Sequence, residues 1–436
     1  MTLRHLLSHR AGFTHEAPVG SNFDSRPVSF AEHILSIPDT WLRYPVGYRF
    51  AYSNVGVDLA GAILEKKAGK PFAEYIREKV LLPLGMTDSS LDLDAILRAS
   101  DRAFGHRAPK DVVPGGIPVE FPMIPAGGVY TNLTDMARYL MFHINEGRVD
   151  GRPLLRADLM QAMHSVAFPE PGQRFGWGLG NAIEHQGPEV YYYHGGGGYG
   201  FASYMAMYPG LKLGIICLTN SESGGEGLDW LSGIVGDLIT KSAGAPGPGL
   251  EKPTFATTHP LPATDPRVRR LLGQYTNDVV LGVKEGVPSI TFQTNVFPLA
   301  FYEDRGEVVG LVEKMAELRF KPPLLVGQPG TLVLLRWPDG PVAYCDFERP
   351  EKSADSPGPN KPDWAGYYGT YKTLDWGRIP SDAPVIVAVD NGYLTVNGRR
   401  CHEYVPGLFF TSSGEALDFR GAIATFRNIL LIRTTK

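Results

Sequence analysis

The sequence predicts an α+β domain followed by an all-β region, and three observations predict this division. Helical and strand-like patterns alternate up to about residue 243, and helical periodicity nearly vanishes beyond about residue 265. The 51 glycines and 36 prolines favour strands with short connections. We therefore expect an antiparallel sheet flanked by helices over 1–243, a linker over 244–265 and a barrel-like β region over 266–436.

The composition is that of a globular protein, with 43% hydrophobic and 20% charged residues. The 42 basic and 46 acidic residues give a net charge of -4 without long runs of either sign, which argues against nucleic-acid binding. The apolar runs are too short to span a bilayer, so we expect no transmembrane segment. Three distant cysteines without a C-x-x-C pair indicate neither a zinc site nor a disulfide framework.

Helix and strand patterns can be assigned in order along the first half. Leu59 and Ile63, then Phe72, Ile76 and Val80, have helical spacing, with a break at Gly69-Lys70-Pro71. An apolar stripe over 133–144 follows Thr131 or Asn132 as the expected N-cap and ends before Gly147. Strand-like runs then occur at 190–193, 202–208 and 211–219, and the apolar positions of 231–239 predict a last helix.

The second half contains a weak internal repeat. Leu271-Leu272-Gly273-Gln274-Tyr275 is similar to Trp364-Ala365-Gly366-Tyr367-Tyr368-Gly369-Thr370-Tyr371, and a polar, proline-bearing run over 348–363 separates the two. Two small β units, 266–347 and 364–436, are one interpretation. A single β domain is nearly as good an interpretation.

Four segments of the first half carry residue types used in catalysis. They are Leu3-Arg4-His5-Leu6-Leu7-Ser8-His9-Arg10-Ala11-Gly12-Phe13, Tyr52-Ser53-Asn54, Ala126-Gly127-Gly128-Val129-Tyr130-Thr131, and His194-Gly195-Gly196-Gly197-Gly198-Tyr199-Gly200-Phe201. Each segment also has a plain structural interpretation. His5 and His9 have the spacing of metal ligands on a helix, but a leucine follows His5 where a metalloprotease helix has glutamate. The glycines at 195–198 suit a plain loop, and no phosphate-binding pattern follows them.

In this order and spacing, the four segments resemble the serine β-lactamase-related family, which includes class C β-lactamases, penicillin-binding DD-peptidases, esterases and D-amino-acid peptidases. The first is similar to the family's T-L-R-H-L-L-S-H-T-S-G signature, with Arg10-Ala11 in place of Thr-Ser. The other matches are Tyr52-Ser53-Asn54 to Y-x-N, 83–86 to P-L-G-M, Ala126-Gly127-Gly128 with Asp135 to A-G-G…D, His194-Gly195-Gly196 to K-T-G or H-x-G, and 209–220 to the strand that follows. The resemblance covers most of residues 1–240 and implies a β-lactamase-like sheet.

The resemblance implies a serine hydrolase that cleaves a small acyl ester or a peptide amide through an acyl-enzyme, without metal or cofactor. Tyr52 would be the general base, with its phenolate favoured by nearby cationic groups, and His194 would complete the proton network. Asn54 would bind the substrate amide. The glycines Gly195, Gly196 and Gly197 would let the substrate lie close to the strand, and the backbone N–H of Gly197 would be one oxyanion donor.

One part of the family's chemistry is absent from the sequence. The family's nucleophile is the serine of S-x-x-K, but no serine of these 436 residues has a lysine three positions later, and no G-x-S-x-G elbow occurs. In the family S-x-x-K lies upstream of the segment that here follows Met1. We therefore expect a chain that lacks the N-terminal strands and nucleophile helix and is inactive alone. Ser8 and Ser53 are the serines to test as substitutes.

Two other functions are compatible with the sequence. One is a non-catalytic pseudoenzyme that binds a ligand or partner, and the other is a histidine-based metal hydrolase. The C-terminal region resembles the barrel-like extensions of D-aminopeptidase-type members. Because family members are often exported, the resemblance implies a periplasmic or extracellular location. It leaves the oligomeric state open.

Overall fold

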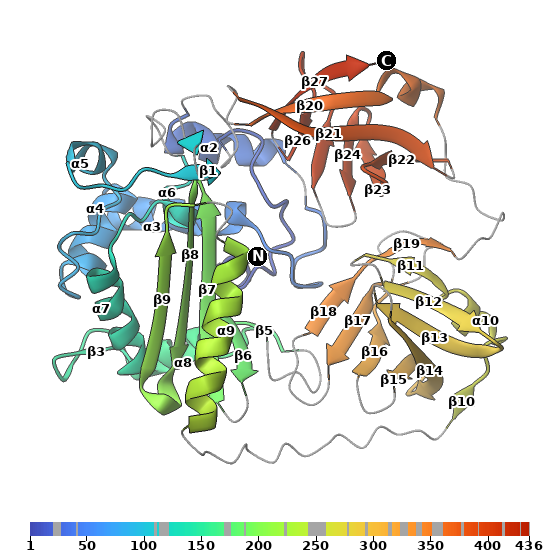
Figure 1. The fold of residues 1–436 in the computed structure, drawn as a ribbon, viewed down its shortest axis with the longest axis horizontal. Helices are drawn as coiled ribbons and strands as arrows, with labels where there is room; N and C mark the ends of the chain where they lie inside the picture. Colours follow the sequence, from blue (N-terminus) through green and yellow to red (C-terminus); the bar gives the residue numbers. More distant parts are fainter. Residues whose placement is uncertain are drawn as a thin grey trace. The chain divides into compact units, whose positions relative to one another are not determined.

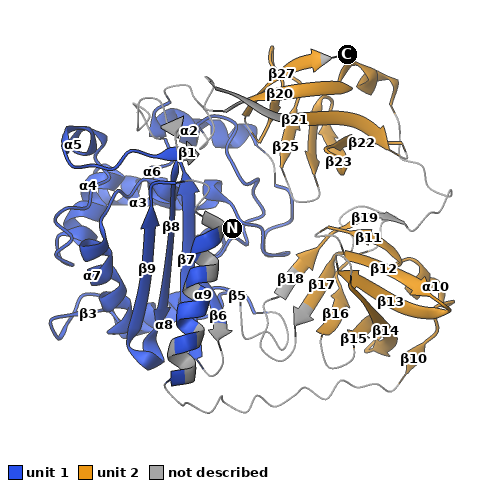
Figure 2. Cartoon of the chain, in the orientation of Figure 1, with its two compact units in different colours: residues 1–250 blue, residues 251–436 orange. Residues whose placement is uncertain are grey.

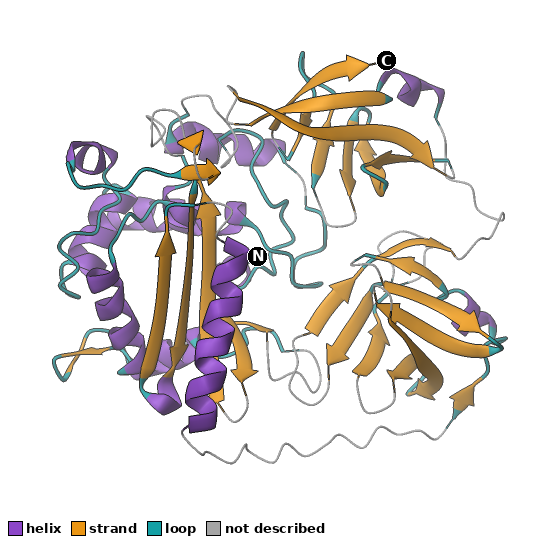
Figure 3. Cartoon of the chain, in the orientation of Figure 1, coloured by secondary structure: helices purple, strands orange, loops and turns teal. Residues whose placement is uncertain are grey.

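The computed structural model describes residues 1–20, 28–40, 42–108, 111–112, 122–169, 176–186, 189–221, 225–242, 259–276, 279–292, 295–312, 316–322, 330–336, 342–350, 361–375, 379–390, 392–411, 415–427 and 429–435. The chain divides into two compact units, 1–250 and 251–436 (Figure 2). The fold-class prediction is confirmed, because unit 1 combines helices with antiparallel strands whereas unit 2 is dominated by strands (Figure 3). The domain bounds 1–243, 244–265 and 266–436 stay predictions, and most of the predicted linker (244–258) lies outside the described residues.

Unit 1 contains a five-stranded antiparallel sheet with helices on both faces (Figure 1). Its helices are α1 (Leu3–Leu7), α2 (Phe30–Ser36), α3 (Asn54–Ala68), α4 (Phe72–Ile76), α5 (Leu93–Arg98), α6 (Ile124–Gly127), α7 (Leu133–Ile144), α8 (Ala157–Met163) and α9 (Gly225–Ser242). A 3-10 turn (Ile37–Asp39) follows α2, a π-helical turn (Arg77–Leu81) follows α4, and another 3-10 turn spans Pro209–Leu211. The sheet has the order β5 (Gly176–Trp177), β6 (Ala182–Gln186), β7 (Glu189–Gly198), β8 (Phe201–Tyr208) and β9 (Leu213–Thr219). Two small hairpins, β1 (His106–Ala108) with β2 (Asp111–Val112) and β3 (Arg148–Val149) with β4 (Arg152–Pro153), lie outside this sheet.

Alternating side chains of β8 account for the two covered faces of the sheet. Met207 packs with Leu140 and Ile144 of α7 on one face. Tyr204, Ala206 and Tyr208 point to the other face and pack in a cluster with Leu228 of α9. Because successive strand residues point to opposite faces, an apolar run such as β8 is buried on both sides.

Helix α3 begins and ends where the sequence signals predict. The Ser53 hydroxyl accepts a hydrogen bond from the Gly56 N–H at 3.2 Å, which makes Ser53 the N-cap. Gly69 ends the helix in the left-handed conformation, with φ of 68°. Gly61 lets α3 approach α6 closely, since a Cβ there would come within 2.2 Å of Pro125. Helix α7 is capped by Asn132, as predicted from the sequence.

The loop interpretation of the glycine run is wrong. Gly195, Gly196 and Gly197 belong to β7, and they pair with Tyr204, Ser203 and Ala202 of β8. Glycine has a low strand propensity by itself, but the β8 ladder supplies the backbone partners here. The turn follows at Tyr199 and Gly200, both with positive φ.

The first half of unit 2 is an antiparallel sheet over 260–350. Its strands are β10 (Pro260–Leu261), β11 (Gly273–Tyr275), β12 (Val279–Lys284), β13 (Val287–Phe292), β14 (Asn295–Asp304), β15 (Glu307–Val312), β16 (Ala316–Phe320), β17 (Leu332–Arg336), β18 (Val342–Cys345) and β19 (Phe347–Pro350), and helix α10 (Pro266–Arg269) precedes β11. The order runs from β18 through β17 to β11 and ends at β19. Because only Asp346 separates β18 from β19, one bent strand joins both edges of the sheet.

The second half of unit 2 is a closed barrel of eight antiparallel strands. These are β20 (Gly369–Asp375), β21 (Ile379–Asp390), β22 (Tyr393–Val396), β23 (Arg399–Val405), β24 (Leu408–Thr411), β25 (Ala416–Asp418), β26 (Thr425–Phe426) and β27 (Ile429–Thr435). A cluster of buried apolar residues that includes Val387, Leu394 and Phe409 forms its core, and a 3-10 turn (Pro362–Gly366) contributes Trp364 to that core. The predicted C-terminal barrel is therefore confirmed.

The helices give no sign of a membrane span. Among the described residues, none of the helices combines the length and the apolar character that crossing a bilayer requires.

Candidate active site

The segment that carries Tyr52 is fixed against the loop after α1. The Ser53 hydroxyl donates to the Thr14 carbonyl at 2.6 Å, and the Asn54 N–H donates to the His15 carbonyl at 2.9 Å. The Ala51 N–H donates to the His9 carbonyl at 2.8 Å. The first and second of the four segments are thus held together by backbone and capping hydrogen bonds, which position Tyr52 at the start of α3.

Aromatic rings surround Tyr52. The His9 ring stacks on it with the ring centroids 4.2 Å apart, and Trp177 of β5 meets both rings edge-on, at 4.8 Å from His9 and 5.7 Å from Tyr52. The Ser53 N–H donates to His9 Nδ1 at 3.2 Å, which places the proton of a neutral His9 on Nε2. Burial, together with the charges of His194 and His15, lowers the pKa of His9 to about 3, so His9 is neutral at pH 7.

His194 reaches the same cluster from β7. Its ring centroid lies 6.4 Å from that of Tyr52 and 5.5 Å from that of Trp177. Its Nδ1 lies 2.5 Å from the Gly195 carbonyl oxygen and therefore donates to it. Burial lowers the pKa of His194, so this ring also favours the neutral form. The structure brings the two residues predicted to be catalytic, Tyr52 and His194, into one cluster.

Asn54 contacts an acidic side chain, Glu16, that the sequence analysis did not predict. Its Nδ2 donates to Oε1 of Glu16 at 2.7 Å, and both side chains are buried. His15 Nδ1 lies 2.9 Å from the same Glu16 oxygen. Glu16 lies three residues beyond the end of the first segment, and nothing in its local sequence indicates a contact with Asn54.

From the sequence we expect cationic groups beside Tyr52, but the charged groups that shift its pKa are carboxylates. Burial, together with the carboxylates of Glu16 and Asp58, raises the pKa of Tyr52 to about 12. Removing a phenol from water and placing it near negative charge both disfavour the phenolate. The described surroundings of Tyr52 therefore oppose its ionisation, in contrast to what a general base needs.

The predicted substrate-binding glycines form an open strand edge. On the β6 side the pairing of β7 stops at Tyr193, whereas on the β8 side it continues to Gly198. Within the strands that the structure describes, residues 194–198 therefore have one unpaired edge. Gly195, Gly196 and Gly197 are exposed, so a ligand can approach the backbone closely there.

The two serines named as possible substitutes for the nucleophile, Ser8 and Ser53, both make structural hydrogen bonds. The Ser8 hydroxyl donates to the Arg4 carbonyl at 2.6 Å, and that of Ser53 donates to Thr14 while it caps α3. Both residues are buried. A nucleophile requires a hydroxyl that donates its proton to a base, and neither of these hydroxyls does so.

The histidines of the first segment do not form a helical metal motif. Helix α1 ends at Leu7, and His9 has a positive φ of 55°, so His5 and His9 do not share one helix face. His5 Nδ1 lies 2.7 Å from the Thr2 hydroxyl, and its ring stacks on Phe168. In the described part of the chain no group of three histidine, cysteine or acidic residues could hold a metal ion.

The A-G-G…D segment has a structural role. Asp135 is fully buried, and its Oδ2 accepts from the Asp88 N–H and from the Ser89 hydroxyl, each at 2.9 Å. The Ala126 N–H donates to Asp58 Oδ1 at 2.9 Å, which ties α6 to α3. Of these contacts, the one between Ala126 and Asp58 reaches α3, the helix that begins at Asn54.

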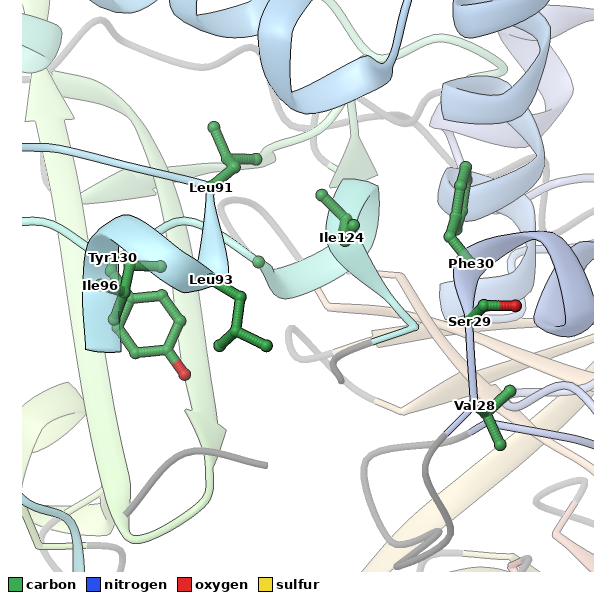
Figure 4. Close-up of a pocket in the computed structure, with 9 residues that line it drawn as sticks. Val28, Ser29, Phe30, Leu91, Leu93, Ile96, Ile124 and Tyr130 are labelled. Atoms are coloured by element: carbon green, nitrogen blue, oxygen red, sulfur yellow. The ribbon is translucent and has the colours of Figure 1, made fainter. Parts of the chain in front are cut away.

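Unit 1 also has an apolar cavity of about 260 Å³ at α2, α5 and α6. Figure 4 shows Leu93, Ile96 and Tyr130 across the cavity from Val28, Ser29 and Phe30, with Ile124 between them. Burial raises the pKa of Tyr130 to about 12. The lining offers a volume for an apolar group, but none of its residues belongs to the Tyr52 cluster.

An antiparallel sheet flanked by helices, with Tyr52 and Asn54 at the start of α3 and His194 on the glycine-rich strand β7, is the arrangement of the serine β-lactamase-related class. The chain belongs to the beta-lactamase family, whose sequence profile, described as Beta-lactamase, matches residues 1–232.

Relatives of known name match the same part of the chain. An unguisins hydrolase of Aspergillus campestris is 26% identical over 232 residues, which cover 51% of this chain and 42% of that protein. The D-alanyl-D-alanine-carboxypeptidase/endopeptidase AmpH of Escherichia coli is 27% identical over 263 residues, which cover 56% and 64%. The chain thus spans less than two thirds of either relative. Among solved structures, the octameric penicillin-binding protein homologue from Pyrococcus abyssi is 21% identical with a TM-score of 0.47, covering 78% of this chain and 77% of that one.

Proposed function

We propose that this chain supplies the base and the substrate-binding groups of an acyl-transfer site for a small acyl ester or peptide amide. The convergence of Tyr52 and His194 carries the proposal, because their rings lie 6.4 Å apart although one precedes α3 and the other lies on β7. The open edge at Gly195–Gly197 beside them supports it, since an extended substrate can pair there.

In this site the nucleophile would lose its proton to Tyr52 as it attacks the substrate carbonyl carbon. The carbonyl oxygen would become an oxyanion that the Gly197 N–H stabilises. Asn54 would bind the substrate amide, and His194 would complete the proton network. Because the pKa of Tyr52 is raised to about 12, the base needs a cation beside it. The lysine of S-x-x-K would serve in this role, and no such motif occurs in these 436 residues.

We therefore propose that this chain alone forms no acyl-enzyme. Ser8 and Ser53 have buried hydroxyls that donate to backbone carbonyls, so neither is available for attack. The test is incubation of the folded chain with a fluorophosphonate and, separately, with a penicillin, followed by intact-protein mass spectrometry. We expect no mass increase. A stoichiometric adduct on any serine, absent after denaturation, would overturn this proposal.

A second candidate function is non-catalytic binding of a ligand or partner by the same site. Two observations favour it. The raised pKa of Tyr52 opposes its action as a base, and the Ser53 hydroxyl already donates to a carbonyl, whereas the strand edge stays open to a ligand. The reading frame upstream of the Met1 codon distinguishes the two functions. An in-frame S-x-x-K favours the hydrolase, whereas a start codon with its own control signals directly upstream favours the pseudoenzyme.

A further inference from the structure

The apolar cavity of unit 1, at α2, α5 and α6, has a volume of about 260 Å³, and its described lining carries no charged side chain. Six aliphatic or aromatic side chains form most of the wall: Val28, Phe30, Leu91, Leu93, Ile96 and Ile124 (Figure 4). A charged group would lose its hydration against such a wall, whereas an apolar group gains dispersion contacts there. The cavity is therefore suited to a neutral, apolar ligand.

Hydrogen bonds hold the walls of this cavity in place. On the α2 side, the Ser29 hydroxyl accepts from the Glu32 N–H at 3.3 Å, and Glu32 Oε2 accepts from the Ser29 N–H at 2.9 Å. On the other side, Tyr130 and Ser90 exchange two backbone hydrogen bonds of 2.9 Å each, and Asp92 caps α5. Because each wall is fixed by bonds of its own, the cavity is formed before a ligand enters, as is usual for small-molecule sites.

Tyr130 offers a hydrogen-bond donor in this apolar wall. The other polar side chain of the described lining, Ser29, donates its hydroxyl proton to Glu32 Oε2 at 2.7 Å. The Tyr130 hydroxyl has no hydrogen-bond partner among the residues that the structure describes. Burial raises the pKa of Tyr130 to about 12, so the hydroxyl keeps its proton at pH 7. A ligand that brings an acceptor to this hydroxyl is favoured over one that leaves it without a partner.

The volume sets the size of the ligand. A cavity of about 150 Å³ lined by leucine, isoleucine and phenylalanine is large enough to bind benzene. A cavity of about 260 Å³ therefore has room for a ring that carries a short substituent.

We propose that this cavity binds a small, neutral molecule with an apolar ring and a carbonyl oxygen. The ring packs between Phe30, Leu93 and Ile124, and the oxygen accepts a hydrogen bond from the Tyr130 hydroxyl. The lining contains no residue of the Tyr52 cluster, so this is a second ligand site that goes beyond the proposed function and does not depend on it.

The first test compares acetophenone with ethylbenzene, which have the same carbon skeleton and differ in the carbonyl oxygen. Binding to the full chain is measured by titration calorimetry and by the methyl resonances of Ile124, assigned with Ile124→Val. We expect both compounds to bind and to shift these resonances. Tyr130→Phe removes only the hydroxyl, so it should weaken acetophenone binding about fivefold, the value of one hydrogen bond, and leave ethylbenzene binding unchanged.

The second test fills the cavity with a larger side chain. Leu93 lines the cavity from α5, so Leu93→Trp should abolish the binding of both compounds. Leu97 lies on the same helix but is 38% exposed and outside the lining, so Leu97→Trp is the matched control and should bind both as the wild type does. Thermal unfolding shows whether each variant folds. Val28→Phe fills the cavity from the opposite wall and replaces Leu93→Trp if that variant does not fold.

Three results would overturn the inference. The first is that neither compound binds, and the second is that a folded variant with a filled cavity binds both as tightly as the wild type. The third is that Tyr130→Phe weakens acetophenone binding no more than it weakens ethylbenzene binding. None of these results bears on the site at Tyr52.

Discussion

His33 and Asp58 form a fully buried pair that links three of the segments around the candidate site. His33 Nε2 lies 3.1 Å from Asp58 Oδ2, and His33 Nδ1 donates to the Val19 carbonyl at 2.8 Å. Asp58 Oδ1 accepts from the Ala126 N–H at 2.9 Å. Since the carbonyl of Val19 can only accept, the Nε2–Oδ2 contact requires a proton on one of its two atoms. The pair therefore joins α2 to α3 only while it holds that proton, whereas the Ala126 N–H joins α6 to Asp58 in either state.

Both members of this pair hold protons more tightly in the folded state. Burial raises the pKa of Asp58 to about 6 from 3.8. Burial alone would lower the pKa of His33, but the hydrogen bond and charge of Asp58 outweigh it and raise that pKa. Glu16 is the other charged group that acts on both. Groups with a raised folded pKa stabilise the fold at low pH, and this contribution is lost as the pH rises.

We predict that the wild type loses stability relative to Asp58→Asn as the pH rises from about 4 to above 6.5. The asparagine can accept from Ala126 and donate to His33 Nε2 without titrating, so it removes the contribution of Asp58 to the pH dependence. The expected change in relative free energy of unfolding is about 3 kcal/mol, from a pKa shift of about two units. Urea unfolding at several pH values measures it. Asp94→Asn, at an exposed position of α5, should show no such trend, and a constant difference for Asp58→Asn would contradict the prediction.

At the scale of residues, motif order predicted which groups lie together, whereas it did not predict their local partners. The convergence of Tyr52 and His194 follows from motif order, because each lies at a fixed place in the fold. Glu16 escaped prediction because its contact with Asn54 depends on how the loop after α1 folds back on α3. The direction of the pKa shift of Tyr52 depends on burial and on that same carboxylate, which motif spacing does not encode.

At the scale of elements, strand β7 has an open edge on the β6 side beyond Tyr193. A helix could be predicted where a stripe of apolar residues follows a capping residue, as in α7, which follows Asn132. The glycine end of β7 was harder to predict, because glycine gives no apolar alternation and its strand conformation comes from the register with β8. Gly196 is the tightest of the three, since a Cβ there would come within 2.6 Å of the Ser203 hydroxyl.

Gly197 is a position where a substitution should change ligand binding without changing stability. A Cβ at this position would have the Phe201 carbonyl oxygen as its nearest neighbour, at 3.8 Å, which is an ordinary contact. We predict that Gly197→Ala keeps the wild-type thermal unfolding midpoint but weakens the binding of a small amide, 4-methylpentanamide, about tenfold, because the methyl group would stand where the proposed ligand meets the strand. Gly227→Ala, exposed on α9, is the control and should leave binding unchanged. Unaltered affinity in Gly197→Ala would show that the ligand does not use this edge.

At the scale of the whole molecule, the second unit repeats one structural plan. Pro266 and Pro362 each begin a short helical turn, and Val268 and Trp364 from these turns are buried in their respective cores. Tyr275 donates to the Leu271 carbonyl at 2.8 Å, and Tyr371 donates to the Tyr367 carbonyl at 2.7 Å. The repeat noticed in the sequence thus occupies equivalent positions at the starts of β11 and β20. The division into units 266–347 and 364–436 stays a prediction, because a shared plan does not show separate folding.

Removing one core residue tests whether the two sheets are independent. Trp364 packs edge-on against Phe409, with the ring centroids 5.5 Å apart, and is 2% exposed. Trp364→Ala should cost about 3–5 kcal/mol, because it removes a large side chain from a closed core. We predict faster amide hydrogen exchange throughout β20–β27 and unchanged exchange in β11–β19, as expected when cooperative units open separately. Val268→Ala provides the reciprocal control in the other sheet. Acceleration of both sheets by either substitution would mean that residues 260–435 unfold as one cooperative unit.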